Sequence, residues 1–525
     1  MEKVFMVEDD PKNILDTYLK VYWKIHFNIF FFLLYLISKV NRHNKKEVIA
    51  MFQIVMMIIH IINFFAIFYM IFKEKRSANS IIAWVLVIYI APLVGFIAFL
   101  LLGRKINNAN MFGIKEIELK LFKDYIRKTQ KEGYLEKDNK NYDMINSIER
   151  MGYSPYREKN QVMMYSDGKE FFSVLLDSLR KAEKSINIEF YIFKTDGIGS
   201  EILSVLEEKA SKGVEVRLLY DSVGSRTLNR RVLKKLTSLG GKTGEFFPSW
   251  LKIVNLNMNF RNHRKIVVID NKVGFVGGFN VGDEYLGKDE KFGYWRDTHV
   301  KIEGDAVKDL NSRFLADWRY ATKEEVDIQE VFAENSIESA GDKGVQILSS
   351  GPNLSDRFEI KLAYLKMIQK ARNYIYIQSP YLIIDNSISD ALKLAALSGV
   401  DVRIMIPGKG DHPFVYWANL FYAGDLLDFG VKIYHYDRNA FLHAKTLVID
   451  DEICSIGTAN MDTRSFELNF EINAYIYSSE IACKQKEQFE KDITKSNELT
   501  LEMYKGRNNK TKIKEGLSKL FSSIL

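Results

Sequence analysis

The sequence predicts an α/β protein with two similar lobes that form one pseudo-two-fold site, preceded by an N-terminal transmembrane helical hairpin. Three observations support this prediction. Two long apolar runs lie near the N-terminus, strand-like and helix-like segments alternate from residue 151 onward, and one motif occurs in both halves of that region. A chain of 525 residues also exceeds what a single core usually holds, so two or three domains are expected.

The composition excludes several classes of protein. Hydrophobic residues make up 47% and charged residues 27% of the chain, which excludes a disordered or low-complexity protein. Only two cysteines occur, Cys454 and Cys483, so neither a disulfide framework nor a cysteine-based zinc site is available. The eight histidines form no HExxH motif, and we expect no metal and no cofactor. The formal net charge of +7 does not by itself indicate nucleic-acid binding.

The membrane hairpin is predicted over residues 49–103. Residues 49–72 are almost wholly apolar and residues 81–102 contain no charge. Each run has the roughly 20 residues needed to cross a hydrocarbon core. Buried helices of a soluble core are the alternative, but two such runs around a short basic segment favour a membrane hairpin. Pro92 and Gly95 are expected to kink the second helix.

Residues 1–48 form a segment whose shorter apolar run, residues 26–38, either spans the membrane, lies at its surface or inserts partway. Acidic residues near the N-terminus argue against a cleaved signal peptide. Basic residues are more numerous outside the hairpin than in its connecting loop. The positive-inside rule therefore predicts a multi-pass protein of the cell membrane whose C-terminal part lies on the cytoplasmic face. Residues 104–150 are expected to form a basic juxtamembrane linker.

The rest of the chain reads as a duplication. Strand candidates at residues 186–193 and 214–220 enclose a helix at 201–212. The same order recurs later, with strands and a helix at residues 374–378, 400–406 and 388–398.

The duplication defines the expected domains. A polar segment separates the two halves, and a basic amphipathic helix ends the chain. That helix either lies on the membrane surface or docks on the body. The expected boundaries are 151–322 for lobe 1, 323–343 for the linker, 344–505 for lobe 2 and 506–525 for the C-terminal helix.

The repeat is sharpest in an H-x-K-x4-D motif, of which both copies are separated by the same 180 positions. A Gly-x-x-Asn element follows each copy at the same offset. Two copies with identical downstream spacing are a strong signal, whereas a single HxK would be a weak one. The motif residues are His263, Lys265 and Asp270, then His443, Lys445 and Asp450, with Asn280 and Asn460 in the following elements.

Strand geometry is expected to bring these side chains together. Alternate residues of a strand share a face, so His263 and Lys265 should lie side by side. The apolar runs after them read as a hairpin turning at residues 271–272, which would place Asn280 across from His263. Gly278 would lie across from Lys265 and leave room for an anion. The second copy correspondingly places Asn460 opposite His443 and Thr458 opposite Lys445.

The two motif aspartates lie seven positions after their histidines, an odd offset that points to the other face of an ideal strand. We expect Asp270 and Asp450 to be at least partly structural, ordering the hairpin turns. A direct role in proton transfer is the alternative.

Two such half-sites around one pocket suit displacement at a phosphodiester. Fixed lysine charges and amide donors meet the charge that develops on the phosphoryl oxygens. One neutral histidine can attack phosphorus while the other, protonated, donates to the leaving oxygen, and the roles then reverse. Opposite protonation requires unlike surroundings, with an acidic partner near one or both rings.

The duplicated motif resembles the signature of the phospholipase D superfamily, and more narrowly the chain resembles the bacterial cardiolipin synthase family. The agreement covers nearly the whole length. It includes residues 83–104 in the second apolar run and the segments 221–225, 277–285, 294–299, 379–381, 407–412 and 460–471.

The resemblance implies two phospholipase D-like lobes, with the six signature residues in one active site. It implies that two phosphatidylglycerol molecules give cardiolipin and glycerol through a phosphohistidine, so the partners are lipids of the bilayer. It also implies that an acidic residue downstream of each motif orients a histidine, with Asp297 and Glu471 as the matching candidates.

Three other functions compete with this prediction. A hydrolytic phospholipase D would use water as acceptor, and the signature does not separate it from a transferase. A nuclease of the same superfamily is disfavoured by the modest net charge and the membrane runs. A non-enzymatic scaffold is disfavoured by two complete motifs. The sequence leaves the oligomeric state open.

Overall fold

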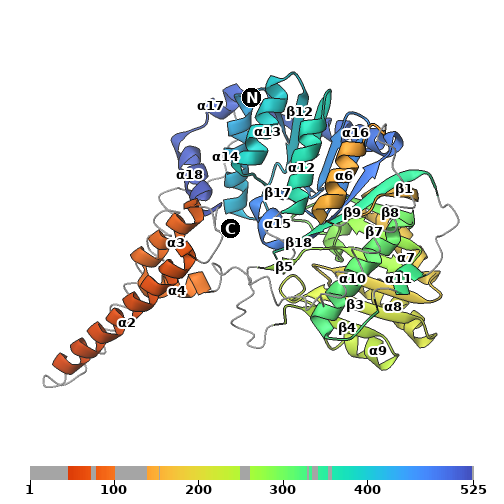
Figure 1. Ribbon diagram of the computed structural model, residues 1–525, viewed down its shortest axis with the longest axis horizontal. Coiled ribbons are helices and arrows are strands. Elements are labelled where there is room, and N and C mark those ends of the chain that lie inside the picture. Colours follow the sequence, from red (N-terminus) through yellow and green to blue (C-terminus); the bar gives the residue numbers. More distant parts are fainter. Residues whose placement is uncertain are drawn as a thin grey trace. The chain divides into compact units, whose positions relative to one another are not determined.

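The computed structural model (Figure 1) describes residues 45–72, 78–100, 139–152, 154–248, 260–327, 330–333, 341–352 and 358–522. These residues belong to two compact units. The first contains the described residues up to 100 together with residues 508–514, and the second contains the others. The apolar run at 26–38 and most of the segment 104–150 lie outside the described residues.

The first unit contains three apolar helices, α2 (Lys45–Phe72), α3 (Ala78–Ile90) and α4 (Pro92–Ala98). Within α2, residues Gln53–Phe72 are long and apolar enough to cross a membrane. The 13 residues of α3 extend over about 20 Å, which is less than a hydrocarbon core of about 30 Å. Among the described residues, one helix therefore meets the length requirement for crossing.

The second apolar run is broken into α3 and α4. The break lies at Ala91, whose φ of −134° and ψ of 77° are not helical, directly before Pro92. A side chain at Gly95 would lie 2.5 Å from the Val87 carbonyl oxygen, so α4 packs closely against α3. The side-chain amide of Asn63 donates a 3.0 Å hydrogen bond to the Pro92 carbonyl. The predicted kink at Pro92 is confirmed, but the hairpin of two spanning helices is not.

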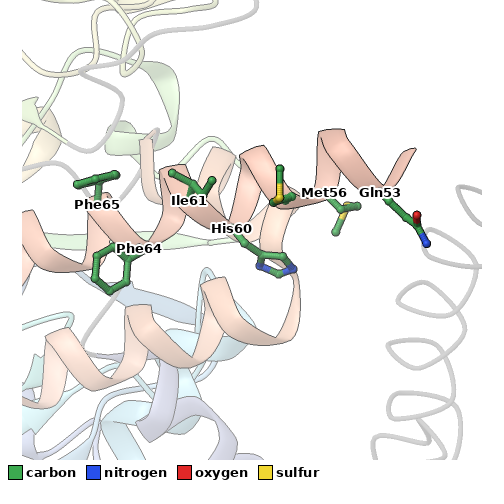
Figure 2. A pocket seen from close by; sticks show the side chains of 7 residues that line it. Gln53, Met56, His60, Ile61, Phe64 and Phe65 are labelled. Carbon is green, nitrogen blue, oxygen red and sulfur yellow. The ribbon is translucent and has the colours of Figure 1, made fainter. Parts of the chain in front are cut away.

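One side of α2 carries an open hollow, and all of its described lining residues belong to this helix (Figure 2). Apolar side chains form most of the lining, and the polar side chains of Gln53 and His60 interrupt them. Such a surface suits acyl chains better than water. The lining residues are Gln53, Met56, Met57, His60, Ile61, Phe64 and Phe65.

The second unit contains a β-sheet that runs through both lobes (Figure 1). In lobe 1, three parallel strands are followed by an antiparallel hairpin and two further strands. Its strands are β1 (Arg157–Asp167), β2 (Ser185–Phe190), β3 (Glu215–Asp221), β4 (Lys242–Phe246), β5 (Arg261–Asn262), β6 (Ile266–Ile269), β7 (Val273–Gly277) and β8 (Tyr294–Gly304).

Lobe 2 repeats this arrangement, and β9 (Lys343–Ser350) joins the lobes because it pairs with β1 on one side and with β18 on the other. The predicted strands at 374–378 and 400–406 are β10 and β12. The strands are β10 (Tyr374–Gln378), β11 (Leu382–Ile383), β12 (Asp401–Ile406), β13 (Lys432–His435), β14 (Ala440–Leu442), β15 (Thr446–Ile449), β16 (Ile453–Gly457), β17 (Met461–Asp462), β18 (Asn469–Tyr477) and β19 (Asn497–Leu499).

Helices cover both faces of this sheet. One hydrophobic core extends through both lobes beneath α10 (Ala306–Thr322) and α16 (Ser479–Ile493). On the opposite face each lobe has its own core. The core of lobe 1 lies under α7 (Gly168–Arg180) and α8 (Gly197–Ser211), and that of lobe 2 under α12 (Glu359–Lys370) and α13 (Asn386–Leu397). The shared core couples the lobes through apolar burial.

The remaining helices lie at the edges of these layers. Among them α6 precedes lobe 1 in sequence, within the segment expected as a linker, but buries Met144 and Ile148 in the core of lobe 2. They are α6 (Tyr142–Gly152), α9 (Leu233–Ser238), the 3₁₀ helix η3 (Asp283–Leu286), α11 (Glu330–Ala333), α14 (Pro413–Leu427), α15 (Thr463–Glu467), α17 (Leu501–Lys505) and α18 (Asn509–Ser522).

The two predicted hairpins are present, but their register differs from the prediction by one residue. Ile266 pairs with Val276 in β6–β7, and Thr446 pairs with Ile456 in β15–β16. The turn has one residue more than expected because Asp270 and Asn271 both adopt left-handed backbone angles, with φ of 53° and 54°. The expected placement of the Gly-x-x-Asn asparagines directly across from the histidines is therefore wrong.

Both motif aspartates bind the backbone at these turns. The Asp270 carboxylate accepts hydrogen bonds from the backbone N–H groups of residues 183, 184 and 185, at 2.7 to 2.8 Å. Asp450 does the same with the N–H groups of residues 372, 373 and 374, at 2.7 to 2.9 Å. Each carboxylate thus joins the hairpin turn to the start of the neighbouring strand, β2 or β10.

We expect the Asp450→Asn variant to lower the free energy of unfolding by about 1–3 kcal/mol, because three backbone donors lose a charged acceptor. Chemical denaturation of the purified protein measures this change. Asp177→Asn is the matched control, since Asp177 is exposed and its ion-pair partner among the described residues is the exposed Arg180. We expect it to change stability by less than about 0.5 kcal/mol. Loss of turnover in fully folded Asp450→Asn protein would instead support a role in proton transfer.

Candidate functional site

The two lobes exchange a short strand at the site. β5 of lobe 1 pairs in parallel with β18 of lobe 2, with Asn262 beside Phe470. β14 of lobe 2 pairs in parallel with β8 of lobe 1, with Leu442 beside Arg296. Each exchanged strand leads directly into an HxK motif. The backbone of each motif is thereby held on the opposite lobe.

Because of this exchange, the two histidine–carboxylate pairs form between the lobes and not within them. The His263 Nδ1 atom lies 3.1 and 3.0 Å from the two carboxylate oxygens of Glu471. The His443 Nδ1 atom lies 2.6 Å from Asp297 Oδ2. Each histidine therefore takes its acidic partner from the other lobe. A carboxylate at Nδ1 favours the tautomer that carries its proton on that atom, which leaves the Nε2 lone pair free.

The HxK residues occupy the irregular connections between β5 and β6 and between β14 and β15, and not a continuous strand as predicted. The Lys265 ammonium donates a 2.6 Å hydrogen bond to the His263 carbonyl oxygen. Lys445 bonds in the same way to the His443 carbonyl. Both lysines are almost fully buried, whereas each histidine keeps 9% of its surface exposed. Of the histidine and the lysine in each motif, the histidine is therefore the residue that reaches solvent.

Burial makes both imidazoles weak bases. It lowers the pKa of His263 to about 4, and although Glu471 opposes this change, Lys265 and then Lys445 add to it. Burial likewise lowers the pKa of His443 to about 4. Lys445 and, to a smaller extent, Lys265 lower it further, whereas Asp297 opposes the change. Each imidazole therefore responds to the lysines of both motifs, which indicates that the motifs converge on one charged cluster.

The lysines and the carboxylates balance one another in this cluster. Burial lowers the pKa of Lys265 to about 7 and that of Lys445 to about 8, while the carboxylates of Asp297 and Glu471 oppose the shift. Burial alone would raise the pKa of Asp297, but Lys445 and His443 outweigh it and the pKa is lowered. In the same way His263 and Lys265 lower the pKa of Glu471. Both carboxylates are therefore ionised at neutral pH.

The small residue of each Gly-x-x-Asn element lies against a carboxylate and not across from a lysine. A side chain at Gly278 would lie 1.9 Å from Asp297 Oδ1. Gly278 therefore leaves room for an anion, as predicted, but the anion is the carboxylate of the protein. At the equivalent position, a hydrogen bond from Thr458 helps to lower the pKa of Glu471.

The two asparagines of these elements have different surroundings. Asn280 accepts a 3.0 Å hydrogen bond from the Ile192 backbone N–H and donates one of 3.0 Å to the Tyr285 hydroxyl. The side-chain oxygen of Asn460 is buried without a hydrogen-bond partner in the part of the chain that is described. Asn280 thus braces neighbouring loops, whereas Asn460 keeps a free acceptor inside the site.

The sequence did not indicate which aromatic rings pack against the histidines. The ring centroids of Tyr191 and His263 are 5.0 Å apart, and those of Trp295 and His443 are 5.2 Å apart. The Lys265 ammonium also lies 5.5 Å from the centre of the Tyr191 ring. Trp295 belongs to a family-like segment, but no spacing rule singles out Tyr191.

Two fully buried arginines were also missed, and both hold the crossing in place. Arg264, between the first histidine and lysine, forms a 2.6 Å ion pair with Asp317 of α10 and donates to the Glu471 carbonyl. Arg296 forms a 2.7 Å ion pair with Asp492 of α16. Breaking such a buried pair would leave an uncompensated charge.

The described residues contain no group of three or more histidine, cysteine, aspartate or glutamate side chains that could hold a metal ion. The arrangement offers two imidazoles, each held at Nδ1 by a carboxylate, and two ammonium groups. Such a set can bind a monoanionic ester and can supply both a nucleophile and a proton donor.

Comparison with known proteins shows the family to which the chain belongs. A family model described as cardiolipin synthase, PLD-like domain, matches residues 175–318 and 364–493. A second, described as phospholipase D-nuclease N-terminal, matches residues 61–104.

Curated relatives match over most of their own length. The chain is 50% identical to a cardiolipin synthase of Staphylococcus aureus over 477 residues, which is 89% of this chain and 95% of the relative. It is 48% identical to cardiolipin synthase 2 of Staphylococcus epidermidis, over 89% of this chain and 96% of that one. Among solved structures, phosphatidylserine synthase of Haemophilus influenzae shares the fold, with a TM-score of 0.58 and 15% identity over 73% of this chain and 100% of that one. The chain therefore belongs to the cardiolipin synthase family of the phospholipase D superfamily.

Proposed function

We propose that this protein transfers a phosphatidyl group reversibly between two phosphatidylglycerol molecules and so produces cardiolipin and glycerol. The observation that supports this most directly is the crossed pairing of His263 with Glu471 and of His443 with Asp297. Crossing makes two distant motifs into one site with two histidines around one anion. Such a site can attack phosphorus and protonate a leaving alkoxide in the same step.

In the first step the Nε2 atom of one histidine attacks phosphorus. A P–N bond forms and the P–O bond to glycerol breaks, while the other histidine donates its proton to the leaving oxygen. The phosphodiester anion favours protonation of that second imidazole, which burial otherwise disfavours. Lys265 and Lys445 stabilise the charge on the phosphoryl oxygens, and Asn460 orients the bound group.

In the second step a hydroxyl group of another phosphatidylglycerol attacks the phosphohistidine. Its proton returns to the histidine that gave one up, a P–O bond forms and the P–N bond breaks. Glu471 and Asp297 hold the two rings throughout. Asp270 and Asp450 support the site through the hairpin turns, since their carboxylates bind backbone N–H groups there. No cofactor takes part in either step.

The second candidate function is hydrolysis, with water as the acceptor and phosphatidic acid as the product. The slight exposure of both histidines favours it, because water can reach these residues. The two reactions share the first step and differ in the acceptor that reaches the intermediate.

The protein is proposed to be a multi-pass membrane protein with its lobes on the cytoplasmic face, and not to bind nucleic acid. The apolar helix α2 and the basic segments around the apolar runs support this location. α18 is proposed to lie on the membrane surface, since Leu517 and Leu520 are 41% and 67% exposed. Its opposite side carries Glu515, which pairs with Arg507.

Purified protein given phosphatidylglycerol alone should form cardiolipin and release glycerol, as measured by thin-layer chromatography of radiolabelled lipid. Phosphatidic acid as the main product would support the hydrolytic alternative.

His263→Ala and His443→Ala should each lower turnover by at least about a thousandfold while the protein stays folded. His412→Ala is the control, because this side chain is 74% exposed and should be dispensable. Full activity in either motif variant would remove that histidine from the mechanism.

We expect Asp297→Asn to lower the rate at pH 7 by at least about a hundredfold. The Asp297 carboxylate raises the pKa of His443, so removing its charge lowers that pKa further, and the imidazole then gains a proton only at lower pH. The profile of kcat against pH should therefore shift towards acid. A slower enzyme with an unchanged pH profile would indicate a merely structural role.

The orientation in the membrane can be tested with a cysteine on lobe 2. In a Cys483→Ser background, Lys409→Cys should react with a membrane-impermeant maleimide only after the cells are lysed. The remaining Cys454 is buried and serves as an internal negative control. Labelling of residue 409 in intact cells would place the lobes on the outer face.

A further inference from the structure

The two half-sites share the same motif but differ in charge. Residues that occupy equivalent positions at the 180-residue offset are Arg261 and Phe441, and Arg464 and Glu284. On the His443 side, Phe441 and Trp295 pack against each other with ring centroids 4.8 Å apart. On the His263 side, the positions equivalent to Phe441 and Glu284 carry Arg261 and Arg464. The site therefore has one aromatic wing and one basic wing.

The basic wing lies beside the reacting groups. Arg261 is on β5, two residues before His263, and its side chain is buried. Arg464 is on α15, whose Ser465 hydroxyl accepts a 3.2 Å hydrogen bond from the Asn460 backbone. Both arginines influence the pKa of Tyr191, whose ring packs against that of His263. Burial and then Asp221 raise the pKa of Tyr191, and the two arginines oppose this rise together with the exposed Arg226.

Two carboxylates, Asp221 and Asp462, also lie near these arginines. Asp221 lies near Arg261, but its oxygens accept hydrogen bonds from the backbone N–H groups of residues 223, 224 and 262. Asp462 accepts from the Ser465 N–H at the start of α15. Burial lowers the pKa of Arg464, and repulsion from Arg261 lowers it further. An anion bound beside both arginines would relieve this repulsion.

The proposed reaction brings a second anion to the site, in addition to the phosphodiester of the donor lipid. In the donor lipid a single phosphodiester sits between the two histidines, where the lysines bind it. The acceptor lipid carries its own phosphodiester, separated from the attacking hydroxyl by the three carbons of its glycerol. That second phosphate must come to rest close to the reacting phosphorus, and cardiolipin retains both.

We propose that Arg464 and Arg261, assisted by Arg226, bind the phosphate of the acceptor phosphatidylglycerol. This inference rests on the proposed transferase function and adds a specificity site to it. The basic wing then selects a lipid acceptor over water or a neutral alcohol, because only the lipid brings a second negative charge. In the aromatic wing the position equivalent to Arg464 is Glu284, whose carboxylate neutralises Lys194 at 2.7 Å.

The test compares two reactions that share a donor and a first step. Purified full-length protein in phosphatidylglycerol micelles is assayed for cardiolipin formation and for exchange of radiolabelled glycerol into phosphatidylglycerol. The acceptor is an anion in the first reaction and neutral in the second. Arg464→Gln should lower the ratio of cardiolipin formation to exchange about tenfold or more. Arg464→Lys should restore part of it.

Arg226→Gln removes an exposed charge of the same wing and should shift the ratio in the same direction even if Arg464→Gln does not fold. Arg180→Gln is the matched control, because it removes a surface arginine that pairs with Asp177 and Glu201. An unchanged ratio in both wing variants would overturn the inference. Wild-type protein that forms phosphatidic acid and no cardiolipin would instead overturn the proposed function itself.

Discussion

The exchange of β5 and β14 between the lobes is the constraint on which the site depends. Because each HxK motif begins on a strand that pairs with the other lobe, its histidine faces a carboxylate from that lobe. Among the described residues, each motif histidine pairs with a carboxylate of the other lobe and not of its own. The apolar core shared beneath α10 and α16, together with the buried ion pairs of Arg264 and Arg296, keeps the crossing in register. Removing one partner of either ion pair would leave a charge that the interior cannot solvate.

Burial of this cluster disfavours each of its charges, so the ammonium groups and the carboxylates stabilise one another. Two ammonium groups face two carboxylates, and both imidazoles stay neutral because burial disfavours their charged form. An incoming phosphodiester disturbs this balance by one negative charge. That charge supports the ammonium form of the lysines and permits one imidazole to take up a proton. The substrate thus completes the protonation state that its own cleavage requires.

Much of this could be predicted from the sequence, since spacing and periodicity carry local information. The duplicated motif, strands such as β10 and the break at Pro92 all follow from patterns within a few residues. The register of the hairpins did not, because the left-handed angles of Asp270 and Asn271 add a residue to a turn that reads as symmetric.

The pairing of each histidine with a carboxylate of the other lobe could not be predicted from the sequence either. Asp297 and Glu471 were expected to orient a histidine, but no spacing rule states that each would serve the other lobe. The packing of α4 against α3 likewise depends on a contact between Gly95 and Val87 that the apolar run does not reveal. The arginines of the basic wing have no arginine counterparts in the other half of the repeat, and both lie near Tyr191.

The difference between the two wings also bears on how a duplicated site comes to bind its two substrate molecules differently. Displacement at phosphorus through a phosphohistidine requires two equivalent histidines, since each step is chemically the reverse of the other. A duplication supplies that equivalence at once. The two molecules that meet there are not equivalent at the moment of transfer, because one has become a phosphoryl group and the other is still an intact lipid. Divergence at positions such as 261 and 441, outside the motif, can then distinguish the two molecules while the reacting groups stay symmetric.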